Sequence, residues 1–396
     1  MRRLLALTTA LMFLELVFFT VLSPLLPELK HDLALSTSQA GVLVAMYAVG
    51  CAVGAIPALM IVARLGVRTT ALVSLATFAA MSVVFGLAHG YDALLAARFV
   101  QGIAGAACWT AAMLWLLEVA PLDRRGELLG FAFGVSEAGA IAGPAAGGIA
   151  AAAGRGATFA AIAALCAVLA LITTRFSGPP APAEKRLGLG GAVADANVRK
   201  VMWITLLPAI MLAAISVLAP LQQHRLGGGS GEIALTFAAA AILGIAIRPF
   251  YGRWSDRQGP LRPVRIGLLA CAPVIVALPW MQTRFGTAAL IALALILIGV
   301  LWAPVMVMLS DACAAAGLGQ LMVVAMMDLT WPPGNIVGSA GGGALAEVAG
   351  QRVTYAVMAG MLLAGWAALS GRHAPVPAPA PAEAVVAADG LSVTGS

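Results

Sequence analysis

Charged side chains are scarce in this sequence of 396 residues, since Asp, Glu, Lys and Arg together make up only 10% of it. A water-soluble domain carries about 25% charged residues. By contrast, 61% of this chain is hydrophobic, and so many apolar side chains cannot be hidden inside one core in water. The composition therefore excludes a soluble domain and predicts a protein that lies within a lipid bilayer.

Cysteine and histidine are also few, with five and four copies. No two cysteines stand at CxxC spacing and the histidines lie far apart, so we expect neither a disulfide framework nor a metal site. The motifs HExxH and GxSxG are missing, and so is a glycine-rich nucleotide loop. We therefore expect no enzyme and no cofactor. The formal net charge of +6 is spread over short loops, which argues against a nucleic acid partner.

What the sequence does contain is a series of long apolar segments. A membrane-spanning helix needs about 20 mostly apolar residues, and twelve segments meet this requirement. Glu15 interrupts the first one, which is therefore expected to be a retained helix and not a signal peptide. We predict an all-α polytopic membrane protein with twelve transmembrane helices near 4–26, 39–62, 70–88, 93–118, 128–152, 156–174, 200–221, 232–250, 264–281, 287–310, 318–345 and 353–370.

Two polar stretches divide the chain. The sequence 175–200 contains Gly178-Pro-Pro-Ala-Pro182 and is typical of a linker. We predict a six-helix half over 1–174, a cytoplasmic linker over 175–200 and a second half over 201–371. The Pro- and Ala-rich tail, 372–396, is expected to be disordered.

The distribution of Lys and Arg predicts the orientation. Most of them lie at loops on the same side as the N-terminus, and basic loops remain in the cytoplasm. We therefore expect both termini to be cytoplasmic in a multi-pass protein of the inner (plasma) membrane. The abundance of Arg, Ala and Gly is typical of a GC-rich bacterial genome.

The sequence contains an internal repeat. The segment Gly139–Gly148 is similar to Gly334–Gly343, and Arg64–Gly66 is similar to Arg257–Gly259 at nearly the same spacing. Chance similarity explains one match between glycine-rich helices, but not two at a shared spacing. The repeat predicts two pseudo-symmetric six-helix halves.

Three motifs carry a resemblance to a known family. They are Gly252-x-x-x-Asp256-Arg257-x-Gly259 after the eighth segment, Arg98-x-x-Gln101-Gly102-x-x-Gly105 in the fourth, and Gly139-x-x-x-Gly143-Pro144-x-x-Gly147-Gly148 in the fifth. Together and in this order they resemble motifs of the major facilitator superfamily, and the third is similar to an element of its drug:proton antiporters. A first-half copy of the loop motif keeps Arg64, Gly66 and Arg68 but has Ala63 in place of the acid.

The first segment adds to this resemblance. Glu15 precedes an apolar run that ends in Pro24-x-x-Pro27, similar to the first helix of vesicular amine transporters and related drug antiporters. The resemblance implies alternating access in a monomer that exchanges a small molecule for protons. It also implies gating roles for the loop motifs and for Gly139, Gly143 and Pro144, where small residues allow close helix packing. Tight packing without movement is the alternative.

Four ionisable residues fall inside apolar segments, where charge is costly and usually functional. They are Glu15, Arg98, Glu137 and Asp328. We expect them to bind substrate or protons in a central cavity, and we expect the Trp331-Pro-Pro-Gly334 sequence after Asp328 to break its helix. The alternative is that the acids form structural ion pairs with Arg98 or Arg248.

The function that these observations favour is proton-coupled export of small lipophilic or cationic compounds. A second hypothesis is proton-coupled export of a sugar, amino acid or other metabolite, although intramembrane Asn, Gln and Tyr are scarce. A third, from another class, is a membrane sensor that transports nothing. The partners expected in the leading hypothesis are the substrate, protons and the lipid bilayer.

Overall fold

A computed structural model describes residues 2–119, 132, 134–136, 138–178, 193–318 and 320–370. The regular elements of these ranges are all helical. The first part of the chain forms α1 (Arg2–Thr20), α2 (Leu22–Asp32), α3 (Thr37–Leu87), α4 (Tyr91–Val119), α6 (Gly139–Ala153) and α7 (Arg155–Thr173). The second part forms α9 (Ala196–Arg225), α10 (Ser230–Gln258), α11 (Leu261–Ala277), the 3₁₀ turn η2 (Leu278–Trp280), α12 (Arg284–Ala315), α13 (Gln320–Ile336), the π-helical turn η3 (Val337–Gly341), α14 (Gly342–Val348) and α15 (Gly350–Ser370).

These helices make up the twelve predicted spans. Nine helical stretches in the described ranges are long and apolar enough to cross a membrane. One of them, α3, is long enough for two predicted spans joined at Gly66. The remaining two correspond to the chain of α13, η3 and α14 and to α6, and the first part of the α6 span, near 128–138, lies largely outside the described residues. The first span consists of α1 and α2. The backbone stays helical at Val21 between them, and only the hydrogen-bond series is interrupted, because Pro24 cannot donate to the Thr20 carbonyl.

The internal repeat is visible in the backbone. The helix α3 kinks at Gly66, where φ is 76° and ψ is 162°, and α10 ends at Gly259, where φ is 77° and ψ is 157°. Both values lie in a region that glycine adopts readily and other residues avoid. The glycine shared by the two loop motifs therefore turns the chain in the same way in each half.

The two glycine rows also pack alike, each against the first span of its own half. A methyl group added to Gly143 would lie 2.9 Å from the Val17 carbonyl oxygen, and one added to Gly338 would lie 2.2 Å from that of Ile210. The glycines on either side follow the same pattern. In the first half Gly139 packs on α1 and Gly147 packs on Val21, and in the second half Gly334 and Gly342 pack on α9. The sequence repeat is thus a structural repeat of helix contacts.

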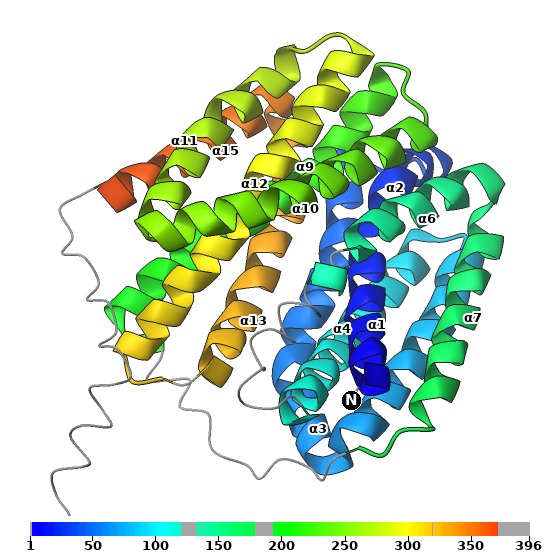
Figure 1. Cartoon of the computed structure of the whole chain (residues 1–396). Coiled ribbons are helices and arrows are strands. Elements are labelled where there is room, and N and C mark those ends of the chain that lie inside the picture. Colours follow the sequence, from blue (N-terminus) through cyan, green and yellow to red (C-terminus); the bar gives the residue numbers. More distant parts are fainter. Residues whose placement is uncertain are drawn as a thin grey trace, which may run out of the picture.

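The two halves meet mainly at one end of the molecule. We call the end where α1 begins the N-terminal face and the end where α2 finishes the far face; the halves diverge toward the N-terminal face (Figure 1). Within the described residues, both hydrogen bonds between the halves lie at the far face. Glu347 accepts one from the Ser38 amide at 2.7 Å, and Glu28 accepts one from the Ser230 hydroxyl at 2.5 Å.

The far-face contacts are reciprocal. Ser38 and Ser230 lie in the first turns of α3 and α10, and the acid comes from the opposite half in each case. Helix N-termini have free amide groups and a partial positive charge, so a carboxylate stabilises them. The far-face interface therefore uses one type of contact twice.

Candidate functional site

Glu15 lies on α1 with only 7% of its surface exposed. The Tyr47 hydroxyl, on α3, donates a hydrogen bond to Glu15 Oε1 at 3.1 Å. A carboxyl group removed from water needs such a partner, because unsatisfied buried polar groups are costly. The structure therefore confirms that Glu15 is an interior residue and gives it a partner that the sequence did not suggest.

Arg98, on α4, is even more buried, with 1% of its surface exposed. Its Nη1 donates to the Phe18 carbonyl oxygen at 2.8 Å and to Gln101 Oε1 at 3.3 Å. Its guanidinium also lies over the Tyr47 ring, 4.6 Å from the centroid, which is a cation–π contact. Among the described residues, Arg98 has no carboxylate within the 4.0 Å of a salt bridge, and its Nε and Nη2 have no hydrogen-bond partner.

Glycines of α4 make room for this cluster. A methyl group at Gly102 would lie 2.0 Å from the Tyr47 carbonyl oxygen. A methyl group at Gly105 would lie 2.4 Å from the Tyr47 hydroxyl and 3.7 Å from Glu15 Oε1. The motif that begins at Arg98 therefore supplies both a buried cation and the space in which Tyr47 reaches Glu15.

Asp328 is a half-buried residue of α13 in the second half, and its charge interacts with that of Glu15. Aromatic rings join the two helices nearby, since Phe19 of α1 and Trp331 of α13 have centroids 4.8 Å apart. Phe19 also faces Tyr47, with 6.2 Å between centroids. The site thus has one acid on each of two helices from different halves, and these helices touch through Phe19 and Trp331, about one turn after the acids.

The expected helix break after Asp328 is displaced. The helix α13 continues through Pro332 and Pro333 to Ile336, and the irregular turn is η3. The prolines still act on the site, because they cannot donate to the carbonyls of Asp328 and Leu329 four residues before them. Freed carbonyls inside a membrane protein are tolerated where they are buried in protein or line a water-filled cavity.

The other predicted site residues are placed as follows. Glu137 lies outside the described residues. Gly139 and Gly143 are buried helix contacts of α6, and the buried Pro144 stands within this helix. The two glycines are apart from the Glu15 cluster but pack on the same first span. On that span the Thr20 hydroxyl, five residues after Glu15, donates to the Gly139 carbonyl at 3.3 Å.

The loop-motif residues lie at the N-terminal face. Arg64 and Arg257 are exposed there, and Arg68 donates to the Thr174 carbonyl at 2.7 Å. The side chain of Asp256 and the surroundings of Gly252 lie outside the described part of the structure, so the gating role predicted for this loop stays a prediction.

Sequence reasoning missed Tyr47, Phe19 and Trp331 as members of the site. Tyr47 carried a weak signal, because tyrosine is rare in this chain, with four copies, and it stands in the middle of an apolar segment. Phe19 and Trp331 carried none, since aromatic residues are common in membrane helices. Only the packing of α1, α3 and α13 brings them together.

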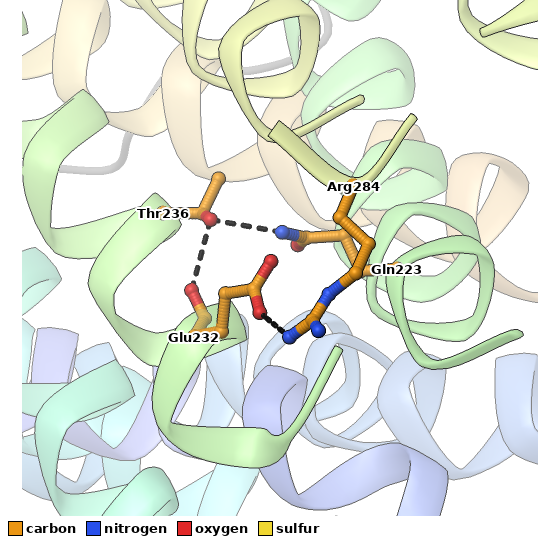
Figure 2. Close-up of polar contacts among 4 residues, drawn as sticks. All are labelled: Gln223, Glu232, Thr236 and Arg284. Carbon is orange, nitrogen blue, oxygen red and sulfur yellow. Dashed lines mark hydrogen bonds and ion pairs between the residues drawn. The ribbon is translucent and has the colours of Figure 1, made fainter. Parts of the chain in front are cut away.

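A second polar cluster lies at the far face of the second half and is separate from this site. Gln223 Nε2 donates to the Thr236 hydroxyl at 2.9 Å, Thr236 donates to the Glu232 carbonyl at 2.9 Å, and Arg284 forms an ion pair with Glu232 (Figure 2). These contacts join α9, α10 and α12. Each of the four side chains contacts another of the cluster, although Gln223 Oε1 accepts no hydrogen bond within the described residues, and we interpret the cluster as structural.

The arrangement around Glu15 is suited to cations and protons. A carboxylate that forms no ion pair in a buried, aromatic-lined setting can bind a proton or an organic cation, and aromatic faces attract such cations. The described residues contain no group of three His, Cys, Asp or Glu side chains suited to a metal ion.

Comparison with known proteins identifies the family. The profile described as the Major Facilitator Superfamily matches residues 8–327. The chain is similar to multidrug resistance protein 2 of Bacillus subtilis, with 22% identity over 85% of this chain and 87% of the relative. It is also similar to a chloramphenicol resistance protein of Streptomyces lividans, with 27% identity over 66% of this chain and 67% of the relative.

Solved structures share the fold. A bacterial homologue of the human lysosomal transporter Spinster, in an inward-facing and occupied conformation, matches with a TM-score of 0.75 and 16% identity over 92% of this chain and 95% of that one. A D-xylose–proton symporter matches with a TM-score of 0.77 and 16% identity over 95% of this chain and 98% of that one. At these identities the likeness concerns the fold alone.

Proposed function

This chain belongs to the Major Facilitator Superfamily, and from this premise we propose that it is a proton-coupled antiporter that exports lipophilic organic cations. It is a multi-pass membrane transporter of small molecules and not an enzyme. The twelve-helix architecture in two halves follows from the same membership. The names of its relatives, which are resistance proteins, support export of foreign compounds.

The observation that carries the proposal is the buried Glu15 carboxyl, which accepts a hydrogen bond from Tyr47 and forms no ion pair within the described part of the chain. A carboxylate in this setting gains by binding either a proton or a cationic substrate. Because one carboxylate cannot hold both, arrival of one displaces the other. Competition of this kind, repeated on each side of the membrane, is antiport.

Asp328 extends this competition to the second half. Its charge interacts with that of Glu15, and the helices that carry the two acids touch through Phe19 and Trp331. When the halves move relative to each other, the distance between the two acids changes, and with it the repulsion that each one experiences. Asp328 is therefore suited to couple proton binding to the exchange of conformations.

We place the N-terminal face in the cytoplasm, as the basic loops predict. The far-face contacts of Glu347 and Glu28 then close the outer side, and the structure corresponds to an inward-facing state. The loop motifs, with Asp256 in the second half and Ala63 in the first, would control the opposite side. The glycine rows allow α6 and the helices α13 to α14 to pack closely on α1 and α9 during the exchange.

The test is transport by the full chain in inverted membrane vesicles. An imposed pH gradient should drive uptake of tetraphenylphosphonium, a lipophilic cation, whereas a sodium gradient should not. Glu15→Gln keeps the shape of the side chain but removes its charge, so exchange should collapse while the protein still inserts and folds. Wild-type transport by this variant, with unchanged pH dependence, would rule out the assignment.

A compound panel in the same assay separates the alternatives. Uptake of a sugar or amino acid in place of cations would favour metabolite transport. Absence of flux for every compound, combined with specific binding of one, would favour a sensor. A single protomer in detergent, measured by light scattering, is the state expected for a carrier whose site lies between its own halves.

A further inference from the structure

Tyr47 lies between two charged groups of the site. Its hydroxyl donates to Glu15 Oε1 at 3.1 Å, and its ring carries the Arg98 guanidinium 4.6 Å from the centroid. The side chain is fully buried, with 0% exposure. One residue therefore contacts an acid through its polar end and a base through its aromatic face.

The position of Tyr47 is determined by the glycines of α4. The close approach of the Tyr47 backbone to Gly102 and of its hydroxyl to Gly105 leaves no room for a methyl group at either glycine. In addition, the Cys51 thiol, one turn after Tyr47, donates to the Gly102 carbonyl at 3.3 Å. These contacts hold the ring in place against α4.

The titratable side chains whose charges interact with that of Glu15 come from three elements. Tyr47 and Cys51 belong to α3, Arg98 and Cys108 to α4, and Asp328 to α13. Opposite charges attract strongly inside a protein, yet Arg98 and Glu15 form no salt bridge in the described structure, although their charges interact. The Tyr47 side chain is the group that contacts both of them.

We propose that Tyr47 is the positioning residue of this site: it separates Arg98 from Glu15 and stabilises the deprotonated carboxylate through its hydroxyl. The carboxylate then stays available to a proton or an organic cation and is not neutralised by its own arginine. This inference rests on the proposed function, in which protons and cations compete for Glu15.

Two substitutions of Tyr47 should shift the pH profile in opposite directions. Tyr47→Phe keeps the ring but removes the donor to the carboxylate, so Glu15 holds its proton more tightly and cation binding requires a higher pH. Hydrogen bonds to charged groups correspond to about tenfold in an equilibrium constant, or about one pH unit. Tyr47→Leu removes the ring, so Arg98 can approach Glu15, and the midpoint should move to lower pH.

A third variant tests the same hydrogen bond without changing Tyr47. Gly105→Ala places a methyl group 2.4 Å from the present position of the Tyr47 hydroxyl, which must then move away from Glu15. It should shift the midpoint upward, as Tyr47→Phe does. The matched controls are Tyr355→Phe, a fully buried tyrosine of α15, and Gly244→Ala, where a methyl group meets nothing within 4 Å.

The measurement is binding of radiolabelled tetraphenylphosphonium to the purified full chain in nanodiscs as a function of pH. We expect upward midpoints for Tyr47→Phe and Gly105→Ala and wild-type midpoints for both controls. For Tyr47→Leu we expect a downward midpoint with about tenfold weaker binding at alkaline pH, because Arg98 then neutralises the carboxylate.

The outcomes separate the two levels of the proposal. If Glu15→Gln abolishes the pH dependence but Tyr47→Phe and Gly105→Ala keep the wild-type midpoint, Tyr47 has no positioning role and the proposed function stands. The same holds if Tyr47→Phe and Tyr47→Leu shift the midpoint in the same direction. If Glu15→Gln itself keeps the wild-type pH dependence, the proposed function is wrong and the role of Tyr47 falls with it.

Discussion

The two halves of this transporter share a backbone but differ in chemistry. The helices α3 and α10 start at Thr37 and Ser230, and α4 and α12 start at Tyr91 and Arg284, in the same spacing. These starts and the shared glycine contacts align the two halves. In this alignment Glu15, Tyr47 and Arg98 of the first half correspond to Pro208, Ala240 and Ile291 of the second. The second-half residues are all buried and apolar or small.

The same contrast appears at the far face of each half. Tyr91 donates to the Gln39 carbonyl at 2.8 Å in the first half. The corresponding residues of the second half, Arg284 and Glu232, form the ion pair of Figure 2. The two contacts join equivalent pairs of helices, α3 and α4 in the first half and α10 and α12 in the second. The comparison teaches that the repeat preserves where helices touch, while the side chains that carry charge have diverged.

The largest effect is expected when the first half is made to resemble the second at Arg98. Arg98→Ile introduces the residue found at the corresponding position 291. Without the nearby positive charge, Glu15 should hold its proton and transport should fall to background. The protein should remain about as stable as the wild type, because Arg98 has no ion-pair partner among the described residues and two of its buried nitrogens have no hydrogen-bond partner there.

Transport of a cation panel and the thermal midpoint check this prediction, with Ile291→Leu as the control. A large loss of stability in Arg98→Ile, together with loss of transport, would show that Arg98 is mainly structural.

The next effect tests whether the second half contributes its acid to coupling. Asp328→Asn should permit downhill movement of substrate but reduce the accumulation driven by a pH gradient about tenfold, the size expected when about 1.4 kcal/mol of coupling is lost. Asp311→Asn, on α12 of the same half, is the control. Counterflow in proteoliposomes measures downhill movement, and gradient-driven uptake measures accumulation. Unchanged gradient-driven uptake by Asp328→Asn would show that Asp328 has no part in coupling.

A smaller effect should be shared by the halves, because it concerns the scaffold. Gly143→Ala and Gly338→Ala each force a methyl group into the neighbouring helix, and overpacking of this kind costs about 1–3 kcal/mol. Gly244→Ala, in open space, should gain about 0.5–1 kcal/mol. Thermal unfolding in detergent checks all three, and similar stability of Gly143→Ala and Gly244→Ala would argue against the packed contact.

The smallest effect concerns the reciprocal far-face contacts. Glu347→Gln keeps a hydrogen-bond acceptor but loses the charge at the N-terminus of α3, and Glu28→Gln does the same at the N-terminus of α10. Each should favour opening of the far face by about twofold, since such contacts are weak near solvent. Cysteine accessibility at Ser38→Cys, a half-buried position whose backbone amide makes the contact with Glu347, reports the opening in a background without the native cysteines. A change in one variant only would show that the two contacts are not equivalent.

Several features were predictable from local sequence. The twelve spans follow from segment length and hydropathy, and the repeat was visible in Gly139–Gly148 and Gly334–Gly343. Glu15, Arg98 and Asp328 were identified because charge is rare inside apolar segments, and the structure buries Glu15 and Arg98 and half-buries Asp328. Their roles stay predictions. Tyr47, Phe19 and Trp331 were not identified, since a single aromatic residue in a membrane helix has no periodic or charged signature.

A helical membrane protein with two related halves could be derived from the amino-acid sequence, because hydropathy and short-range glycine patterns act within a single helix or between adjacent ones. The place of Tyr47 between Glu15 and Arg98 could not, and it became known from the folded structure. That arrangement depends on how closely α3 approaches α4, which Gly102 and Gly105 permit. The folded structure also decided which face is closed, because the contacts of Glu28 and Glu347 join residues that are distant in the sequence. Contacts of this kind arise from packing between halves, and no local pattern specifies them.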